Sequence, residues 1–583
     1  MSTSRTVTGT GSAESRLTTH RWAAPLILAI LALLPYANSL RLDFVWDDRA
    51  LILESPYVQD VRHLGEGLVS DYWKNPDYPG SQRFFYRPLM TLSFFIDHAL
   101  WGENPVGFHL TNLLLHLINV LLVYSCFSVL ASRELAFVSA ALFAVHPVHT
   151  ESVTWISGRT DLLASTWVLG AFRGYLSLAN PSRSLLRLSA VGFLYILALL
   201  TKEVAIVLVV ALALHLRFLP PDEPLRRLYK SAIWILAGIA FLYSILRILV
   251  LEMPLWTSTE RPLWLLIFNL PRLLARYLLK LVFPLRLYAH DPMEWVEPHQ
   301  WPQVLLASFI LVAAAAGVWA LAKRNRLALF GAAWTGVFLL PVLNAGTFTD
   351  VLVAERFLYL PSVGFCWMLA VGYGLARETE GWRRPALAAL LAVILLAGAR
   401  TWLRNPVWSN EIVLFEEIHR TSPNYLLPHR ALASAYLRHG RPEDAIEELD
   451  HVLARSPGNC GALNDLALAY YDAGTRLRAG EYLDTGFNLA RRAVNGCPEN
   501  DALHHTLGEY YLRLRNVAGN MDLALDEFQK AIAVNPRALY YFSLGSTLVS
   551  LGRIDEARPY LAEYVRLAPG GENRERALGW LNP

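Results

Sequence analysis

The stretch WAAPLILAILALLPYANSLRLDFVWDD (Trp22–Asp48) decides the fold, because an apolar run of membrane length ends there on two acidic residues. The run Trp22–Leu40 fits a span of ~20 residues better than the ~7–15-residue core of a secretory signal. We therefore predict an uncleaved first membrane helix. Asp47 and Asp48 then lie where the chain leaves the membrane, and neighbouring carboxylates favour a proton, a metal ion or a cation between them. The alternative is a solvated acidic turn at a helix end.

The composition divides the chain into an apolar part and an ordinary one. Of the 583 residues, 54% are hydrophobic and 17% are charged, against about 25% charged in soluble domains. The apolar excess lies in 22–403, and 404–583 has ordinary polarity. The net charge of +3 is too small to indicate nucleic-acid binding. We predict an all-α protein, a multi-pass membrane helical bundle followed by a soluble domain.

Hydropathy predicts about 11 membrane spans in this apolar part. Two other segments differ: Arg87–Trp101 mixes aromatic and polar residues, and Leu263–Leu285 carries cations at spacings of four, which suits an interfacial helix. Those cations are Arg272, Arg276 and Lys280. The predicted spans are Trp22–Leu40, Val106–Leu130, Glu134–Pro147, Leu162–Ala179, Leu185–Leu200, Val204–Leu219, Ala232–Leu251, Val304–Ala322, Leu327–Phe348, Phe357–Ala376 and Ala386–Leu403.

The loop charges predict the orientation. Basic residues recur in alternate short loops, as in Arg183 and Arg187 or Lys323 and Arg324, which is typical of cytoplasmic loops. Residues 1–21 are then a cytoplasmic tail, 22–403 a polytopic membrane domain with its first outer loop at 41–105, and the C-terminus is extracytoplasmic. The membrane is a bacterial inner membrane or, in a eukaryote, that of the endoplasmic reticulum, and the outer face is the periplasm or lumen.

Six polar clusters collect on the predicted outer face. Charges at membrane helix ends are costly and are usually functional or paired. Lys202-Glu203 is the clearest case because it interrupts an apolar stretch, although a tight polar turn between helices explains it equally well. The clusters are Asp47-Asp48, His146–Glu151, Ser157–Asp161, Lys202-Glu203, His290-Asp291 and Glu355-Arg356.

These residue types suit transfer of a sugar from a lipid phosphate. A carboxylate of the acidic pair supplies a base for the acceptor hydroxyl, and Arg159, Lys202 and Arg356 supply cations for the leaving phosphate. His146, His149 and Glu151 either ligate a divalent metal or orient the phosphate; their spacing is no standard zinc pattern, so metal is the weaker option. No cofactor is otherwise predicted. Asp161, Glu203 and Glu355 complete the set as supporting polar residues.

Residues 424–583 contain an internal repeat, preceded by a predicted linker at 404–423. Pro457, Pro498, Pro536 and Pro569 end successive units, and each unit carries small and aromatic residues in the tetratricopeptide pattern. About four such helix pairs form an α-solenoid whose concave face binds a peptide or a partner domain. The alternative is a stabilising appendage without a ligand.

The four cysteines divide in the same way. Cys126 and Cys366 lie in apolar runs and are predicted to be packing residues. Cys460 begins the second repeat and Cys497 ends it, so antiparallel helices bring them to the same side of the unit. They form either a disulfide that staples this lengthened repeat or two separate buried thiols.

The polar motifs resemble, in order, those of the transmembrane and tetratricopeptide-repeat O-mannosyltransferase family. The resemblance implies a C-type glycosyltransferase that uses a polyprenyl- or dolichyl-phosphate sugar, with Asp47 and Asp48 as the catalytic pair and Asp47 favoured as the base. Only about four repeats are present, fewer than in the long animal members, which leaves the acceptor open. The matching motifs are DFVWDD (43–48), YRPL (86–89), FHLTNLLLH (108–116), HPVHTESV (146–153), WISGRTD (155–161), TKE (201–203) and ERFLYLP (355–361).

Three functions are consistent with these observations. The first is an integral-membrane glycosyltransferase that moves a sugar, mannose by the resemblance, to hydroxyl groups of an extracytoplasmic protein engaged by the repeats. The second is a non-enzymatic, membrane-anchored repeat scaffold for complex assembly, whose polar clusters only pair with one another. The third is a related transferase that acts on a glycan or glycolipid.

Overall fold

The computed structural model describes residues 22–74, 85–179, 184–251, 262–347, 352–422, 425–514, 516–568 and 573–582. Within these ranges the secondary structure is helical and includes no strand, so the all-α prediction is confirmed. The chain divides into two compact units. Unit 1 comprises Met1–Tyr72 and Phe84–Asn410, and unit 2 comprises Trp73–Arg83 and Glu411–Pro583. The predicted cytoplasmic tail, 1–21, lies outside the described residues.

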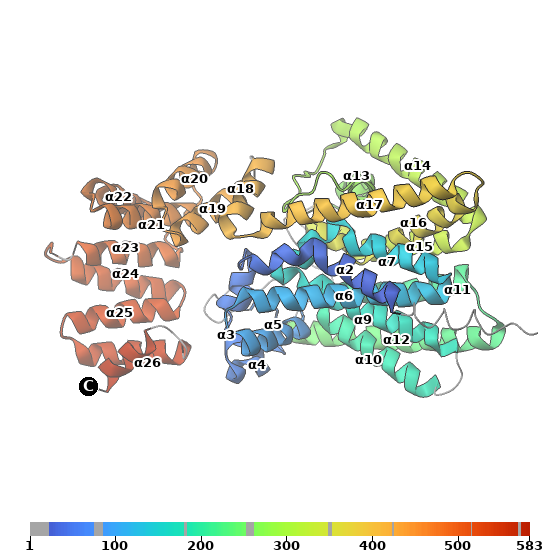
Figure 1. Cartoon of the computed structure of the whole chain (residues 1–583). Helices are drawn as coiled ribbons and strands as arrows, with labels where there is room; N and C mark the ends of the chain where they lie inside the picture. Colours follow the sequence, from blue (N-terminus) through green and yellow to red (C-terminus); the bar gives the residue numbers. More distant parts are fainter. Residues whose placement is uncertain are drawn as a thin grey trace, which may run out of the picture. The chain divides into compact units, whose positions relative to one another are not determined.

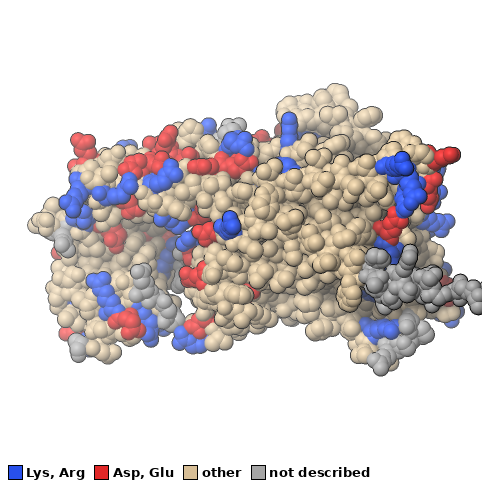
Figure 2. Space-filling view, viewed as in Figure 1, with Lys and Arg blue, Asp and Glu red and all other residues tan. Residues whose placement is uncertain are grey.

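Unit 1 is a bundle of apolar helices (Figure 1). Among the described residues, eight helices are long and apolar enough to cross a membrane, so the multi-pass prediction is confirmed. Leu305, Leu306, Phe309 and Val312 on one of them are more than half exposed, as lipid-facing side chains would be. Figure 2 shows a broad surface over α2, α6 and α17 with almost no charged side chains. The eight are α2–η1 (Ala23–Arg41), α6 (Pro105–Leu130), η4–α9–η5 (Ile156–Ala179), α10 (Ser184–Thr201), α12 (Glu223–Leu251), η7–α14 (Pro298–Arg324), α15 into η8 (Arg326–Leu343) and α17–η10 (Arg383–Trp408).

The other three predicted spans are shorter or more polar helices. α7 (Arg133–Val145) has 13 residues and α11 (Leu208–Phe218) has 11, which is under about 20 Å against a ~30 Å hydrocarbon core. α16 (Pro361–Glu378) has 18 residues but ends on Arg377 and Glu378. α7 packs between α6 and α16, and its alanines are fully buried there. α7 is therefore apolar because it faces protein.

Shorter helices complete unit 1. The two segments that the sequence separated from the spans are α5 (Pro88–Trp101) and α13 (Leu263–Val282). α5 packs on α6 and α10, and α13 on α14. The remaining elements are η2 (Arg49–Leu53), α3 (Pro56–Gln59), α4 (Val61–Gly67), η3 (Pro147–His149), α8 (Thr150–Thr154), η6 (Glu203–Val207) and η9 (Glu355–Leu358).

Unit 2 is the predicted solenoid of four helix pairs, with one further helix before them and one after. The predicted linker 404–423 contains the first of these, α18 (Glu411–Thr421), which packs on α19. Small residues let paired helices touch: a Cβ on Gly508 would meet Phe528 at 2.5 Å, and one on Gly545 would meet Leu561 at 2.7 Å. Pro569 lies outside the described residues. The pairs are α19 (Leu426–Arg438) with α20 (Pro442–Arg455), α21 (Cys460–Leu477) with α22 (Gly480–Gly496), α23 (Asp501–Arg513) with α24 (Asn520–Val534) and α25 (Ala538–Ser550) with α26 (Ile554–Leu567), followed by α27 (Arg574–Leu581).

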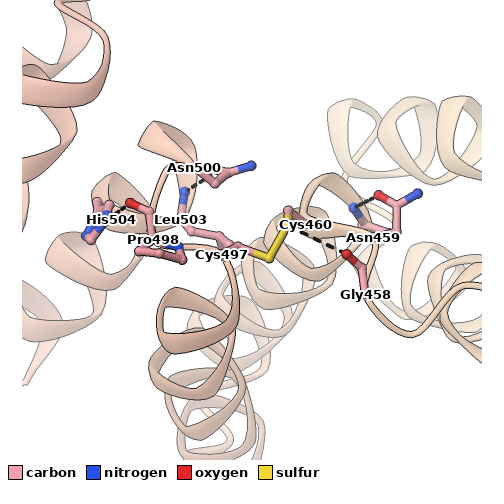
Figure 3. The surroundings of a disulfide bond; sticks show 9 residues. Gly458, Asn459, Cys460, Cys497, Pro498, Asn500, Leu503 and His504 are labelled. Atoms are coloured by element: carbon pink, nitrogen blue, oxygen red, sulfur yellow. Dashed lines mark hydrogen bonds between the residues drawn. A yellow bond between two sulfur atoms is a disulfide. The ribbon is translucent and has the colours of Figure 1, made fainter.

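A disulfide joins Cys460 to Cys497, with Cα atoms 5.9 Å apart (Figure 3). It links the start of α21 to the residue after α22, which is the staple that the antiparallel pair permits. Beside it, Asn459 caps α21 and Asn500 caps α23 through their side chains. A cross-link over 37 residues stabilises the fold by about 3–4 kcal/mol in the chain-entropy model. Cys126 and Cys366 are free, buried packing residues, as predicted.

Candidate active site

The acidic pair lies on a tight turn directly after the first span. Asp48 is fully buried. Its Oδ2 accepts a hydrogen bond from the Val45 N–H (3.0 Å), and its Oδ1 accepts from the Ser157 N–H (2.9 Å) and hydroxyl (2.5 Å). Asp47 is half-buried. The two carboxylates therefore have different environments, one locked inside the protein and one at its surface.

Three stacked tryptophans hold this turn in place. Trp46 stacks on Trp155 with ring centroids 5.6 Å apart, and Trp155 stacks on Trp408 at 5.5 Å. The Trp155 indole N–H donates to the Val45 carbonyl (3.3 Å). Trp46 has φ of 56°, a left-handed conformation that is costly for a bulky residue and that sharpens the turn directly before the two aspartates. Sequence reasoning did not single out this stack.

Arg356 lies beside the acidic turn, from η9. It donates through its backbone N–H to Glu151 (2.8 Å) and forms an ion pair with the same carboxylate, and it lies over the Trp155 ring at 5.4 Å. Although burial lowers it, the negative charges of Glu151, Asp161 and Asp47 leave the pKa of Arg356 above its ordinary value. The side chain is still 20% exposed, so an anion can reach it.

Two more cations belong to the same cluster. Lys202 donates to Asp161 (2.6 Å), and Arg87 forms an ion pair with Glu203 (3.0 Å). Burial lowers the pKa of Lys202, the nearby positive charges of Arg87 and Arg356 add to the effect, and Asp161 opposes it. Arg87, Lys202 and Arg356 thus share one region although they come from three distant motifs. Arg87 lies in the YRPL motif, and the sequence alone predicts no role for it.

Arg159 has a different setting. Its side chain is 0% exposed, and it forms an ion pair with Asp97 at 2.5 Å. It also donates to Asn112 (2.8 Å), to the Ser93 hydroxyl (3.0 Å) and to the Phe108 carbonyl (2.9 Å). Because its guanidinium has protein partners on every side, Arg159 of α9 connects this helix to α5 and α6. This placement favours a structural role over the predicted contact with phosphate.

Glu355 belongs to a second buried network next to the first. Lys280 of α13 contacts both Glu355 (2.8 Å) and Asp291 (2.9 Å), and Arg276 contacts Asp291 (3.1 Å). Of the cations predicted to form an interfacial surface on this helix, Lys280 is buried, whereas the Arg276 side chain remains 32% exposed. Glu355 supports the backbone, since it also accepts from the Tyr288 N–H (2.5 Å).

The two histidines of the HPVH motif form hydrogen bonds with other residues of the protein. His146 Nε2 lies 3.0 Å from the Leu281 carbonyl, and His149 Nε2 lies 2.8 Å from the Ser362 hydroxyl. Both rings are buried, and His149 packs against Phe143 and Tyr359. Glu151 binds Arg356. These three residues therefore contact three different partners within the protein.

A polar scaffold in the bundle core positions the motifs. Asn112 donates to the carbonyls of Val153, Trp155 and Ile156 at 3.1–3.3 Å and so fixes the turn before α9. His116 bridges the Ala144 carbonyl (3.0 Å) and the Tyr359 hydroxyl (2.8 Å). The FHLTNLLLH motif thus supports the site from inside the membrane bundle.

The titration of Asp48 gives a first testable prediction. Burial raises its pKa to about 7, the hydrogen bonds from Ser157 and Val45 oppose the rise, and the charge of Asp47 adds to it. Protonation below about pH 7 removes the charge of the Asp48 carboxylate, so the hydrogen bonds from Val45 and Ser157 that hold the turn are no longer charge-assisted. We expect catalytic turnover to fall about tenfold per pH unit below that pKa. Ser157→Ala removes a hydrogen bond that lowers the pKa of Asp48, so the fall in rate on the acidic side of a pH–rate profile should begin at higher pH. An acidic side that is unchanged in this variant would contradict the assignment of that titration to Asp48.

The amino-acid sequence is similar to those of several known proteins. Residues 430–485 and 517–572 match the tetratricopeptide repeat family. Human protein O-mannosyl-transferase TMTC3 is 24% identical over 595 residues, which cover 94% of this chain and 64% of that protein. Mouse TMTC4 is 28% identical over 464 residues (69% of this chain, 62% of that protein), and Drosophila melanogaster Tmtc1 is 28% identical over 525 residues (73% and 61%). This chain therefore spans a little under two thirds of the length of these relatives.

Among solved structures, the Archaeoglobus fulgidus oligosaccharyltransferase aligns with 70% of this chain and 59% of its own, at 12% identity and a TM-score of 0.40. That value is too low to support a conclusion. The match to human TMTC3, in contrast, covers 94% of this chain, and the names of these relatives agree with the resemblance carried by the polar motifs. The chain is a membrane protein with tetratricopeptide repeats, and it is similar over most of its length to the proteins named protein O-mannosyl-transferase.

Proposed function

We propose that the protein is an integral-membrane glycosyltransferase that moves mannose from a polyprenyl- or dolichyl-phosphate donor to hydroxyl groups of an extracytoplasmic protein. The observation that carries the proposal is the acidic turn of Asp47 and Asp48 beside three cations. A base next to a cluster that attracts phosphate, at the end of a membrane bundle, suits a donor with its tail in the lipid and its head at the surface. The names of the relatives support the same class of reaction.

The geometry divides the work between the two aspartates. Asp47, at the surface, takes the proton of the acceptor hydroxyl as that oxygen bonds to the sugar's anomeric carbon, and the bond from that carbon to the lipid-phosphate oxygen breaks. Asp48 is inaccessible and acts as a positioning residue through Val45 and Ser157. Arg356 and Lys202 neutralise the lipid phosphate that leaves, and Arg87 supports them.

The transfer reaction itself is the decisive experiment. The purified full chain in lipid nanodiscs is supplied with polyprenyl-phosphate mannose and a Ser/Thr-rich acceptor protein, and mass spectrometry detects the added hexose. The same analysis of extracytoplasmic proteins from cells with and without the protein identifies native acceptors. Unchanged protein glycans together with an altered glycolipid would assign the related glycolipid transferase, and no changed glycan at all would favour the scaffold.

Arg356 supplies a second prediction, on donor binding. Arg356→Lys keeps the charge that pairs with Glu151 but loses the planar two-pronged contact that suits phosphate, so we expect the donor KM to rise about tenfold or more with kcat changed less. Initial rates at varied donor concentration measure this. Arg377→Lys is the matched control, because Arg377 also pairs with a glutamate, Glu134, at the end of another membrane helix. An equal rise in both variants would remove Arg356 from the donor site.

The orientation is a third prediction. Hydrogen bonds join the loop after the first span to η4 (Ile156–Gly158), through the Ser157 N–H and Asp48, and to the residue after the last span, through the Asp43 N–H and the Ser409 carbonyl (3.0 Å). The first and last spans therefore both run toward the site, which requires an odd number of crossings and supports counting the short helices among them. A reporter after Arg324 should be cytoplasmic, and reporters after Asp60 or Pro583 extracytoplasmic. A cytoplasmic C-terminal reporter would separate the repeats from the catalytic face and defeat their proposed role in acceptor binding.

A further inference from the structure

Unit 2 contains a group of potential metal ligands in which α18, α19 and α20 meet. His419, His429 and Glu448 each offer one ligand atom, and these atoms all lie within 4.8 Å of one another. Each residue comes from a different helix. Within the described parts of the chain, this is the one such group of three or more His, Cys, Asp or Glu side chains. It lies outside the site described above and outside the motifs that predicted that site.

The contacts within the group fit the spacing of a metal site. His429 is fully buried, and its Nδ1 lies 2.7 Å from Glu448 Oε2. The His419 ring meets His429 edge-on, with centroids 4.4 Å apart, and its buried Nδ1 has no hydrogen-bond partner among the described residues. Two bonds of about 2.1 Å at a tetrahedral angle separate ligand atoms by roughly 3.4 Å, so small side-chain rotations suffice to reach that spacing.

A fourth residue extends the group. His451 follows Glu448 by three positions on α20, which places both on one face of the helix. Its ring centroid lies 5.3 Å from that of His429, and it is exposed. Solvent and this imidazole are therefore both available for the last position of a four-coordinate ion.

We propose that His419, His429 and Glu448 bind a divalent transition metal, with Zn²⁺ as the best fit. Two imidazoles and one carboxylate are the ligand types that Zn²⁺ takes in sites that keep an open position. The metal would fasten α18, the first helix of unit 2, to both helices of the first repeat.

The test measures bound metal in the full chain. Detergent-purified protein is stripped with chelator, loaded with Zn²⁺, freed of excess metal and analysed by elemental mass spectrometry. We expect the intact chain to hold one equivalent more than Glu448→Gln or His419→Gln, because losing a ligand costs more than the ~10–100-fold known for residues that only support one. His439→Gln, at the end of the same helix α19 but outside the group, is the matched control and should keep the equivalent.

A second readout guards against variants that misfold. Zn²⁺ should raise the melting temperature of unit 2 in the intact chain and in His439→Gln but not in Glu448→Gln, whose amide still reaches His429 and preserves the packing. Bound Co²⁺ should show the strong visible absorption of a four-coordinate ion. Equal metal content in all variants, or no melting shift in the intact chain, would overturn the proposal. Neither result bears on sugar transfer, which is assayed separately.

Discussion

Replacing Asp47 by asparagine is expected to lower sugar transfer by about 10²–10⁴-fold, the usual cost of removing a general base. The amide keeps the size of the side chain, and Asp47 is half-buried on the surface of the turn, so the fold should survive. Donor KM should change little, because the cations that hold phosphate remain. Initial rates with saturating donor measure the effect, and an unchanged melting temperature confirms that the protein is intact.

Asp43→Asn is the control for this variant. Asp43 lies on the same loop and is exposed, and its Oδ1 accepts a hydrogen bond from the N–H of the next residue, Phe44, at 2.7 Å. This variant should transfer at the rate of the unaltered chain. Full activity of Asp47→Asn would exclude Asp47 as the base; if Asp48→Asn were equally active, the carboxylate pair would have no catalytic role and the scaffold function would gain support.

Replacing Arg159 by methionine is expected to destabilise unit 1 by about 3–5 kcal/mol, because it leaves the buried carboxylate of Asp97 without its ion pair. The loss should appear as a lower melting temperature in detergent, with activity falling in proportion to the folded fraction. This result would separate Arg159 from the cations that contact the donor.

The double variant Arg159→Met with Asp97→Asn tests the same ion pair by removing both of its charges. Removing both charges leaves no uncompensated ion from this pair in the core, so the double variant should recover part of the lost stability. The amide introduced by Asp97→Asn is still able to accept from the Thr111 hydroxyl, which contacts the Asp97 carboxylate at 2.9 Å. A single Arg159→Met variant of unchanged stability with a raised donor KM would restore the phosphate-binding role.

The sequence predicted the helical class from its apolar runs and the repeats from their period. It also predicted the set of polar clusters, because charged residues within apolar runs are conspicuous without a structure. It did not predict how the clusters pair. Lys202 and Glu203 are neighbours in the chain, yet one binds Asp161 and the other Arg87. Arg159 and Arg356 have the same chemistry in sequence, and only packing shows that the first is enclosed by α5 and α6 while the second keeps an exposed edge.

The span count has a similar physical cause. Hydropathy measures how apolar a segment is and does not distinguish lipid neighbours from protein neighbours. α7 is apolar because it packs inside the bundle, and both α7 and α11 are shorter as regular helices than the lipid core is thick, so their length alone does not identify them as spans. The His419, His429 and Glu448 group is invisible for another reason: its members lie on three helices with no motif spacing, so they meet only after folding.

The bond between Cys460 and Cys497 decides how material for experiments has to be made. A host that leaves the repeats in its cytosol keeps both thiols reduced, and the second repeat is then assembled without its cross-link. Acceptor screens or crystals obtained from such preparations would report on a looser solenoid. Export into an oxidising compartment, followed by purification without thiol reductants, yields the covalent form in which α21 and α22 of the second repeat are cross-linked.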